Sequence, residues 1–207
     1  MWCRHFLLSL SGVLLLASSV GAADFDSIEK LPVEKRIEKY SELLGSEKDS
    51  LEVLSRLGNA YFDGGRTEDA VRTYRRALQA GGDRKVVLNL AYALGELGRR
   101  DEVGQLYRDQ LDESPDDALL HAFYADFLTE EQVETKKAIG MAVREYQKAI
   151  ELDAKCAEAH FGMGVLFARM GILKEAIREW EKVLAIDPKG RMAPQAKKNI
   201  DQARQPR

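Results

Sequence analysis

Two histidines and one cysteine carry the most versatile side-chain chemistry in the central part of the sequence, namely His121, His160 and Cys156. Histidine and cysteine are metal ligands, and Cys156 lies four residues before His160, a spacing that can place both side chains on one face of a helix. No carboxylate lies at a clear ligand spacing from them, and the sequence lacks paired cysteines, a metalloprotease histidine motif and a phosphate-binding glycine loop. We therefore expect structural histidines, no metal, no cofactor and no enzymatic activity.

Cys156 is the second of two cysteines, and the first, Cys3, lies in an N-terminal segment that we expect to be removed. A single remaining cysteine cannot form an intramolecular disulfide. We interpret Cys156 as a small, partly buried apolar residue. An intermolecular disulfide or a redox-active thiol is the alternative interpretation.

The N-terminal segment has the three-part layout of a secretory signal peptide. Arg4 precedes an apolar run over residues 6–17, and small residues and then acidic sequence follow. The run is about a dozen residues long, which is short for a helix that spans a bilayer. We predict a signal peptide over 1–23, cleaved after Ala22 or Ala23, and hence a periplasmic or secreted protein with no membrane span after cleavage. Retention of the segment as an uncleaved anchor is the alternative.

The charge of the sequence is mildly acidic and evenly distributed, with 31 Lys and Arg residues against 34 Asp and Glu residues. Nucleic-acid binding requires concentrated positive charge, which these interleaved charges do not provide. The charge pattern is typical of a solvated helical surface, and we expect no nucleic-acid partner.

From residue 51 onward, apolar residues recur at helical spacing, and the whole pattern repeats about every 34 residues. Each repeat has a small residue in its first helix and an aromatic residue in its second. These pairs are Gly58 and Tyr74, Ala91 and Tyr107, Ala125 and Tyr146, and Gly164 and Trp180. A small residue lets two helices approach closely, and an aromatic ring fills the space toward the next repeat. Four sets in near-register predict stacked pairs of antiparallel helices.

This pattern resembles that of the tetratricopeptide repeat family, whose repeats carry a Leu-Gly pair, a following aromatic residue, and then alanine, a second aromatic residue and proline. The resemblance spans residues 51–190. It implies an all-α fold, a right-handed superhelix of antiparallel helical hairpins, with repeats at 51–83, 84–117, 118–156 and 157–190.

Two of the repeats depart from the family pattern. The second has Val103 where alanine is usual, and Gln110 at the later alanine position. The third has five extra residues in the turn region 129–137. We interpret this insertion as a longer turn or an extended helix, and a second contact point on the edge of the array is the alternative.

A cap is expected at each end of the array, since the outermost repeats of a stack would otherwise expose an apolar face. Residues 24–50 contain a helical stripe that includes Tyr40 and Leu43, in register with a second helix, so we predict a half repeat there. Residues 191–207 contain Pro194, which suits a first helical turn, and then a thin apolar stripe. They are predicted to form a capping helix and a tail.

The resemblance also implies a binding groove, because the first helices of such repeats line the concave face of the superhelix. We select candidate partner-binding residues from the positions that point inward in the family. They are Asn59, Phe62, Leu88, Tyr92, Leu119, Asp126, Phe161 and Val165. This mixture of apolar, aromatic and isolated polar groups suits an extended or helical peptide with apolar anchors. Packing between repeats is the alternative role for each of them.

One subgroup of the family binds a C-terminal carboxylate with Lys, Asn and Arg side chains. Asn59 and Asn89 stand at compatible positions. Ser55, Leu119 and Phe123, however, occupy positions where the cations would be needed. The sequence therefore argues against a carboxylate clamp.

These features together favour an exported, non-enzymatic scaffold or adaptor that holds a protein or peptide partner. By analogy with exported members of the family, we expect a role in cell-envelope assembly or secretion. A self-associating, homo-oligomeric structural element is the alternative function, and a redox role through Cys156 is a third.

Overall fold

The computed structural model describes residues 24–46, 49–130 and 135–205, and every regular element within these ranges is a helix. The predicted signal peptide lies outside the described residues. In chain order the helices are α1 (Phe25–Glu29), α2 (Val33–Ser46), α3 (Leu51–Asp63), α4 (Thr67–Gln79), α5 (Arg84–Glu96), α6 (Arg100–Glu113), α7 (Ala118–Thr129), α8 (Lys136–Leu152), α9 (Ala157–Arg169), α10 (Leu173–Ile186) and α11 (Ala193–Arg204). No helix in these ranges is both long enough and apolar enough to cross a bilayer.

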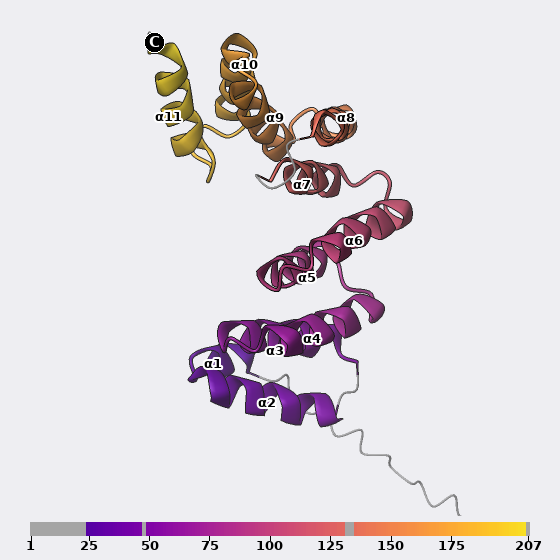
Figure 1. The fold of residues 1–207 in the computed structure, drawn as a ribbon. Helices are drawn as coiled ribbons and strands as arrows, with labels where there is room; N and C mark the ends of the chain where they lie inside the picture. Colours follow the sequence, from indigo (N-terminus) through magenta and orange to yellow (C-terminus); the bar gives the residue numbers. More distant parts are fainter. Residues whose placement is uncertain (1–23, 47–48, 131–134, 206–207) are drawn as a thin grey trace, which may run out of the picture.

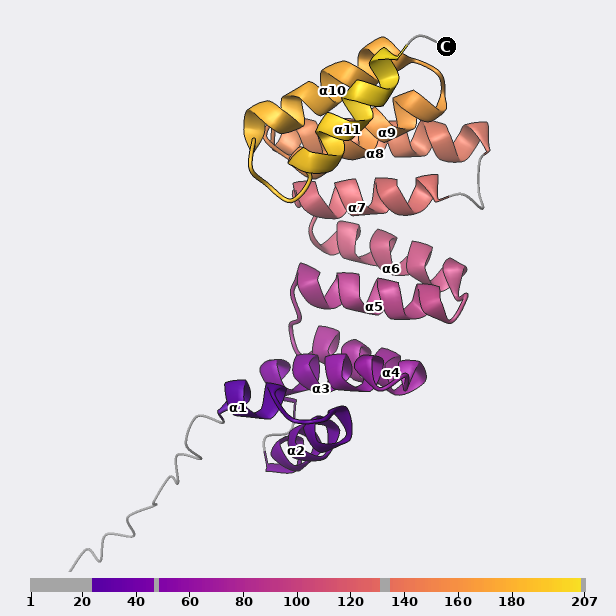
Figure 2. The ribbon, with the colours of Figure 1, turned by 90° about the vertical axis from the view of Figure 1, so that its left-hand side faces the viewer.

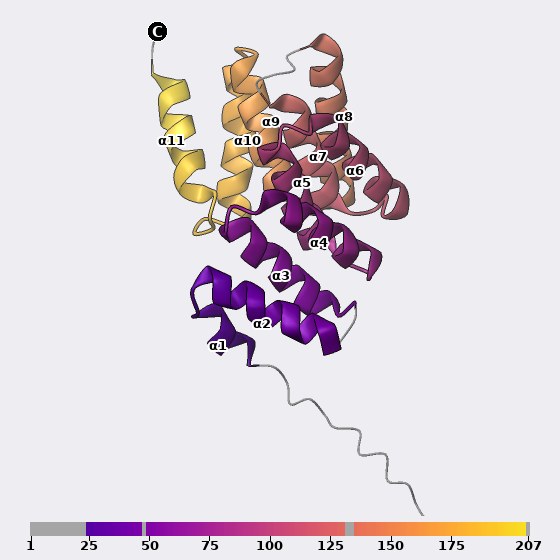
Figure 3. The ribbon, with the colours of Figure 1, turned by 60° about the horizontal axis from the view of Figure 1, so that its bottom comes forward.

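Consecutive helices form antiparallel pairs that stack along the chain (Figure 1). The pairs are α3–α4, α5–α6, α7–α8 and α9–α10, and their order along the stack follows the sequence (Figure 2). At one end α2 packs against α3, and at the other α11 packs against α10 (Figure 3). The predicted all-α superhelix of helical hairpins is confirmed.

Close approach of the two helices in the first and fourth pairs depends on a glycine that faces an aromatic ring. A Cβ atom on Gly58 would lie 2.5 Å from the ring of Tyr74, and one on Gly164 would lie 2.6 Å from the indole nitrogen of Trp180. Both rings are almost completely buried. Any side chain at either glycine would therefore overpack the contact and push the helices apart.

The terminal helices bury apolar side chains against the ends of the stack. Tyr40 of α2 is completely buried, and its hydroxyl donates to Glu29 Oε1 at 2.7 Å. Ala196 and Ile200 of α11 pack with Trp180 of α10 in one apolar cluster. Both helices therefore cover faces that the outermost repeats would otherwise expose to water.

The connection within a repeat has the same form in the first, second and fourth repeats. Gly65, Gly98 and Gly171 each adopt a positive φ, between 69° and 76°, which glycine adopts at little cost. The sequence of the third repeat has no glycine in the turn region 129–137, and α8 begins only at Lys136. This helix has 17 residues, against 13 or 14 in α4, α6 and α10. The extra sequence thus lengthens both the connection and the helix, and residues 131–134 of the predicted turn lie outside the described residues.

The second pair, α5–α6, is packed less closely than the other three pairs. Val103 is buried between its helices, at the position where the other repeats have the completely buried Ala70, Ala142 and Ala176. The distance between helix axes depends on the size of the side chains at the contact, so the larger valine keeps α5 and α6 further apart. The departure that the sequence shows at Val103 therefore has a structural consequence, a more open hairpin in the second repeat.

Candidate functional site

The two histidines that could have been metal ligands connect helices within the protein. His121 Nδ1 lies 2.7 Å from Glu145 Oε2 of α8, and its Nε2 lies 3.0 Å from the Pro115 carbonyl oxygen. His160 Nδ1 lies 2.6 Å from Glu179 Oε2 of α10, and its other ring nitrogen also faces a backbone carbonyl oxygen. Both rings are buried and use both nitrogens inside the fold. The structural role predicted for the histidines is confirmed.

Cys156 is only 3% exposed and occupies the position just before α9. Burial raises the pKa of its thiol, which keeps the sulfur protonated and weakly nucleophilic. Its surroundings are those of a small buried residue, as the sequence suggested, and they give no support to the redox alternative.

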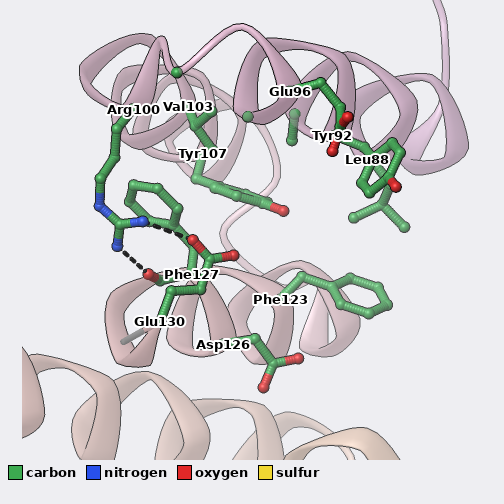
Figure 4. A pocket seen from close by; sticks show the side chains of 13 residues that line it. Leu88, Tyr92, Glu96, Arg100, Val103, Tyr107, Phe123, Asp126, Phe127 and Glu130 are labelled. Carbon is green, nitrogen blue, oxygen red and sulfur yellow. Dashed lines mark hydrogen bonds and ion pairs between the residues drawn. The ribbon is translucent and has the colours of Figure 1, made fainter. Parts of the chain in front are cut away.

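A pocket of about 600 Å³ opens between the α5–α6 pair and α7 (Figure 4). We call it the second-repeat pocket. Its wall is built from the open face of the α5–α6 hairpin and from one face of α7. The lining residues are Leu88, Ala91, Tyr92, Gly95, Glu96, Gly98, Arg100, Val103, Tyr107, Phe123, Asp126, Phe127 and Glu130.

Aromatic rings form much of the wall of this pocket. The ring centroid of Tyr107 lies 5.7 Å from that of Tyr124 and 5.8 Å from that of Phe127, which fixes Tyr107 between α6 and α7. Tyr92 of α5 is 62% exposed, and its ring lies 5.3 Å from that of Phe62 in the first repeat. A large aromatic side chain that is exposed yet held by a neighbour is typical of a binding surface.

In two of the repeats, the tyrosine of the second helix is hydrogen-bonded to the first helix. The Tyr74 hydroxyl donates to Asn59 Oδ1 at 2.7 Å, and the Tyr146 hydroxyl donates to Asp126 Oδ1 at 2.5 Å. Each acceptor directly follows the small residue of its first helix. Asn59 Oδ1 also accepts from Asn89 Nδ2 at 3.0 Å, so the two asparagines that a carboxylate clamp would use are bonded to each other.

In the second repeat this internal bond is missing. Its tyrosine is Tyr107, and the position that follows the small residue is the exposed Tyr92. Within the part of the chain that the structure describes, the Tyr107 hydroxyl has no hydrogen-bond partner. The hydroxyl points into the second-repeat pocket, although the residue is only 6% exposed (Figure 4). A buried tyrosine usually bonds its hydroxyl, so this group is available to a ligand.

Arg100 is the only cation among the lining residues, all of which lie in the described ranges, and its guanidinium is already engaged. It pairs with Glu130 Oε2 at 2.6 Å and donates to the Phe127 carbonyl oxygen at 2.7 Å. It also lies 4.4 Å from the centroid of the Phe127 ring. Glu96 has no hydrogen bond or ion pair with any other described residue. The pocket therefore has an excess of negative charge.

Asp126 lines the pocket, and its carboxyl group has a raised pKa. The surrounding protein atoms desolvate this group and raise its pKa to about 6, although the residue as a whole is open to solvent. The hydrogen bond from Tyr146 lowers the pKa, whereas the charges of Glu130 and Glu158 raise it further. The high pKa thus reports both desolvation and repulsion between neighbouring carboxylates.

The eight residues selected from the sequence do not form a single site. Leu88, Tyr92 and Asp126 line the second-repeat pocket, and the ring of Phe62 packs against that of Tyr92. Asn59 is used in the internal hydrogen bonds of the first two repeats.

The other three candidates lie elsewhere on the stack. Leu119 packs in the third-repeat core and borders a separate surface pocket that includes Pro115. Phe161 packs against the apolar cluster shared by α10 and α11. Val165 lines a smaller pocket of about 370 Å³ beside α11.

Sequence reasoning missed the contribution of the second helix to the pocket. Tyr107 and Arg100 of α6 were outside the selected positions because the resemblance places the groove on first helices. Phe123 was noted only as unsuited to bind a carboxylate, yet it lines the pocket. The signal that could have identified them was Val103. A residue larger than alanine at this helix contact implies that the two helices of the repeat lie further apart.

Models of the tetratricopeptide repeat match the sequence at residues 55–118, 138–171 and 157–189. The predicted resemblance is therefore confirmed over more than half of the chain. No curated protein matches the sequence significantly.

Many solved structures share the fold at low sequence identity. YrrB, described as a tetratricopeptide repeat protein with an unusual peptide-binding site, is 19% identical, with a TM-score of 0.56 over 84% of this chain and 87% of that one. MamA from Desulfovibrio magneticus is 17% identical, with a TM-score of 0.60 over 81% and 92%. A tetratricopeptide repeat protein from Parabacteroides merdae is 17% identical, with a TM-score of 0.66 over 86% and 70%. At these identities the likeness shows the fold alone.

Proposed function

Because the chain is built of tetratricopeptide repeats, we propose that it is a non-enzymatic scaffold that binds a segment of a protein partner in the second-repeat pocket. The observation that carries the proposal is an open pocket of about 600 Å³ with the exposed Tyr92 and with the Tyr107 hydroxyl, which bonds to no described group. Concave sites with apolar walls and a few converging polar groups are the usual form of ligand sites in proteins. YrrB, which shares the fold, is described by its peptide-binding site.

The shape of the pocket favours a peptide segment over a small molecule. Its wall is continuous with the ring pair of Tyr92 and Phe62 in the neighbouring repeat. A bound chain can therefore extend from the pocket across α5 toward α3. Peptides that bind in grooves place apolar anchors in pockets and leave the intervening residues on the surface.

We further propose that the protein acts outside the cytoplasm, in cell-envelope assembly or secretion. This proposal rests on the predicted signal peptide over 1–23 and on analogy within the family. Its test is fractionation of cells that express the full sequence, combined with N-terminal sequencing of the product. A mature N-terminus at Ala23 or Asp24 in the periplasmic or secreted fraction is expected, and an intact N-terminus in the cytoplasm would contradict it.

The binding proposal is tested by removing aromatic surface from the pocket. Tyr92→Ala combined with Phe123→Ala should abolish partner crosslinks in a crosslinking pull-down from the native cell fraction. The matched control is Met170→Ala combined with Ile172→Ala, which removes exposed apolar surface from the connection between α9 and α10. Equal loss of crosslinks in both variants, or no loss in either, would contradict the assignment of the pocket.

Self-association is the competing function, and the same pocket could serve it if a second copy of the chain supplied the bound segment. Light scattering of the purified protein over a range of concentrations separates the two functions. A molar mass that stays that of the monomer at every concentration supports binding of a different protein. A dimer that Tyr92→Ala dissociates would instead favour the self-associating element.

A further inference from the structure

We propose that the second-repeat pocket recognises a cationic side chain, a lysine or an arginine that is flanked by an apolar residue in an extended peptide. This inference rests on the proposed function and specifies the chemistry of the segment that the pocket binds. The charges are opposite to those of the carboxylate clamp that the sequence argues against, because here carboxylates of the protein would bind a cation of the ligand.

The first support is the balance of charge in the pocket. Three carboxylate residues, Glu96, Asp126 and Glu130, line it together with one guanidinium, that of Arg100. The guanidinium is neutralised by Glu130 and is also bound to the Phe127 carbonyl oxygen. Among the described residues, two of these carboxyl groups therefore lack a cationic partner. They lie in a concave wall that concentrates their field, and such a wall attracts positive charge.

The second support is the environment of Asp126 on α7, α8 and α9. Glu130 at the end of α7 and Glu158 on α9 are like charges, and Tyr146 on α8 donates a hydrogen bond to Asp126. Arg169 of α9 donates to the Thr129 carbonyl oxygen. A ligand cation beside Asp126 would relieve the repulsion among these carboxylates, which is a favourable term available only in the complex.

The third support is the arrangement of the aromatic groups. Figure 4 shows the Tyr107 hydroxyl, the Phe123 ring and the Tyr92 ring around one open space, with Asp126 below it. Aromatic faces attract lysine and arginine through their π electrons. The phenolic oxygen of Tyr107, which no described group bonds, can accept a hydrogen bond from an ammonium or guanidinium group.

The fourth support concerns the residue next to the cation. Leu88 is half-buried beside Tyr92 and lines the same pocket as Phe123. This apolar strip would be covered by an apolar side chain that precedes or follows the cation in the bound peptide. The burial of that side chain supplies affinity, and the carboxylates select the charge.

The test compares three fluorescently labelled peptide libraries of equal length. Their central residues are Leu-Lys-Leu, Leu-Gln-Leu or Leu-Glu-Leu, and the flanking positions are randomised. Fluorescence anisotropy measures binding to the full protein, and methyl NMR of Leu88 reports whether the pocket is occupied. The lysine library is expected to bind about tenfold more tightly than the glutamine library, and the glutamate library most weakly.

Charge-neutralising variants give a sharper test. Glu96→Gln combined with Asp126→Asn should bring the ratio of lysine-library to glutamine-library affinity down to about one. Glu34→Gln on α2 is the matched control, because it removes an exposed carboxylate far from the pocket and should preserve the preference. In the wild type, the preference should shrink between pH 8 and pH 5, as Asp126 becomes protonated.

The outcomes separate this inference from the proposed function. If the glutamine or glutamate library shifts the Leu88 signals as strongly as the lysine library, the pocket binds peptides and the inference is wrong. If no library shifts these signals, the inference and the proposed function both fail. If the Leu88 signals move with protein concentration alone, a second copy of the chain is the occupant, and the inference is overturned.

Discussion

The second and fourth repeats contain the same elements, and they differ in how closely the two helices meet. In the fourth repeat Gly164 lies against the buried ring of Trp180, and the helices α9 and α10 are in close contact. In the second repeat Val103 separates α5 from α6, and Tyr107 faces a pocket. The comparison indicates that a repeat can be closed, and contribute mainly stability, or open, and offer a surface to a ligand.

The largest expected effect is at the closed contact of the fourth repeat. Gly164→Leu should lower the free energy of unfolding by about 3 kcal/mol, because the new side chain collides with Trp180. Gly95→Ala in the second repeat is the counterpart, since an added Cβ there meets no atom within 4 Å. It should stabilise the protein by up to about 1 kcal/mol through helix propensity. Chemical denaturation measures both, and equal effects would mean that the two repeats are packed alike.

The next effect concerns the residue that separates α5 from α6. Val103→Ala should lower the free energy of unfolding by about 2 kcal/mol, because it removes buried carbon atoms. It should also let the hairpin close and narrow the second-repeat pocket. Spin labels at the exposed positions Lys85 and Asp112 would report a shorter distance between α5 and α6. An unchanged distance would show that Val103 does not set the opening.

A pair of tyrosine variants compares a bonded hydroxyl with one that bonds to no described group. Tyr146→Phe should lower the free energy of unfolding by about 1.5 kcal/mol, because it deprives Asp126 of its donor. Tyr107→Phe should change stability by less than about 0.5 kcal/mol, since its hydroxyl has no partner among the described residues. The Tyr107 variant should instead weaken peptide binding. A large stability loss in Tyr107→Phe, seen in thermal unfolding, would reveal a bond inside the protein.

The smallest effect is the pH dependence of two carboxyl groups. The folded-state pKa of Asp126, about 6, lies above its unfolded value. Its contribution to stability is therefore present at low pH and is lost as the pH rises through about 6. Asp126→Asn should stabilise the protein at pH 8 by less than about 1 kcal/mol, since the residue is exposed and its charge is screened. The gain should vanish near pH 4.

Glu179 in the fourth repeat should show the opposite pH dependence. Burial alone would raise its pKa, but hydrogen bonds from His160 and Lys182 outweigh burial and lower it. Its contribution to stability is present above the unfolded pKa and is lost as the pH falls through the lowered value. Glu179→Gln should therefore destabilise at neutral pH and less in acid. Matching pH profiles for Asp126→Asn and Glu179→Gln would contradict the opposite pKa shifts of these two carboxyl groups.

The sequence predicted the closed parts of the molecule better than the open one. Gly58 and Gly164 are recognisable because a helix contact that requires the smallest residue recurs at a fixed distance from an aromatic one. The recurring pairs of small and aromatic residues do not predict which side chains face a pocket where the two helices lie further apart. Asn59, Tyr92 and Asp126 occupy equivalent positions, yet only Asn59 and Asp126 accept a hydrogen bond from the tyrosine of the second helix.

The position of Tyr107 shows where sequence reasoning stops. An aromatic residue at this place in a second helix is expected to fill space toward the next repeat, and Tyr107 does contact Tyr124 and Phe127. That its hydroxyl faces a pocket follows from two coincident departures, Val103 between the helices and Tyr92 at the position of the usual acceptor. Neither departure alone predicts the pocket, because the opening depends on how three helices adjust together.

Site-specific photocrosslinking tests most directly whether the open repeat is the one that binds. Benzoylphenylalanine replaces Tyr92 in the second-repeat pocket or, in a separate variant, the exposed Gln202 of α11, which borders the pocket of the closed fourth repeat. Irradiation in the native host should crosslink a partner polypeptide from position 92 and none from position 202. Crosslinks from position 202 alone would contradict the account, because they would place the partner on the closed repeat.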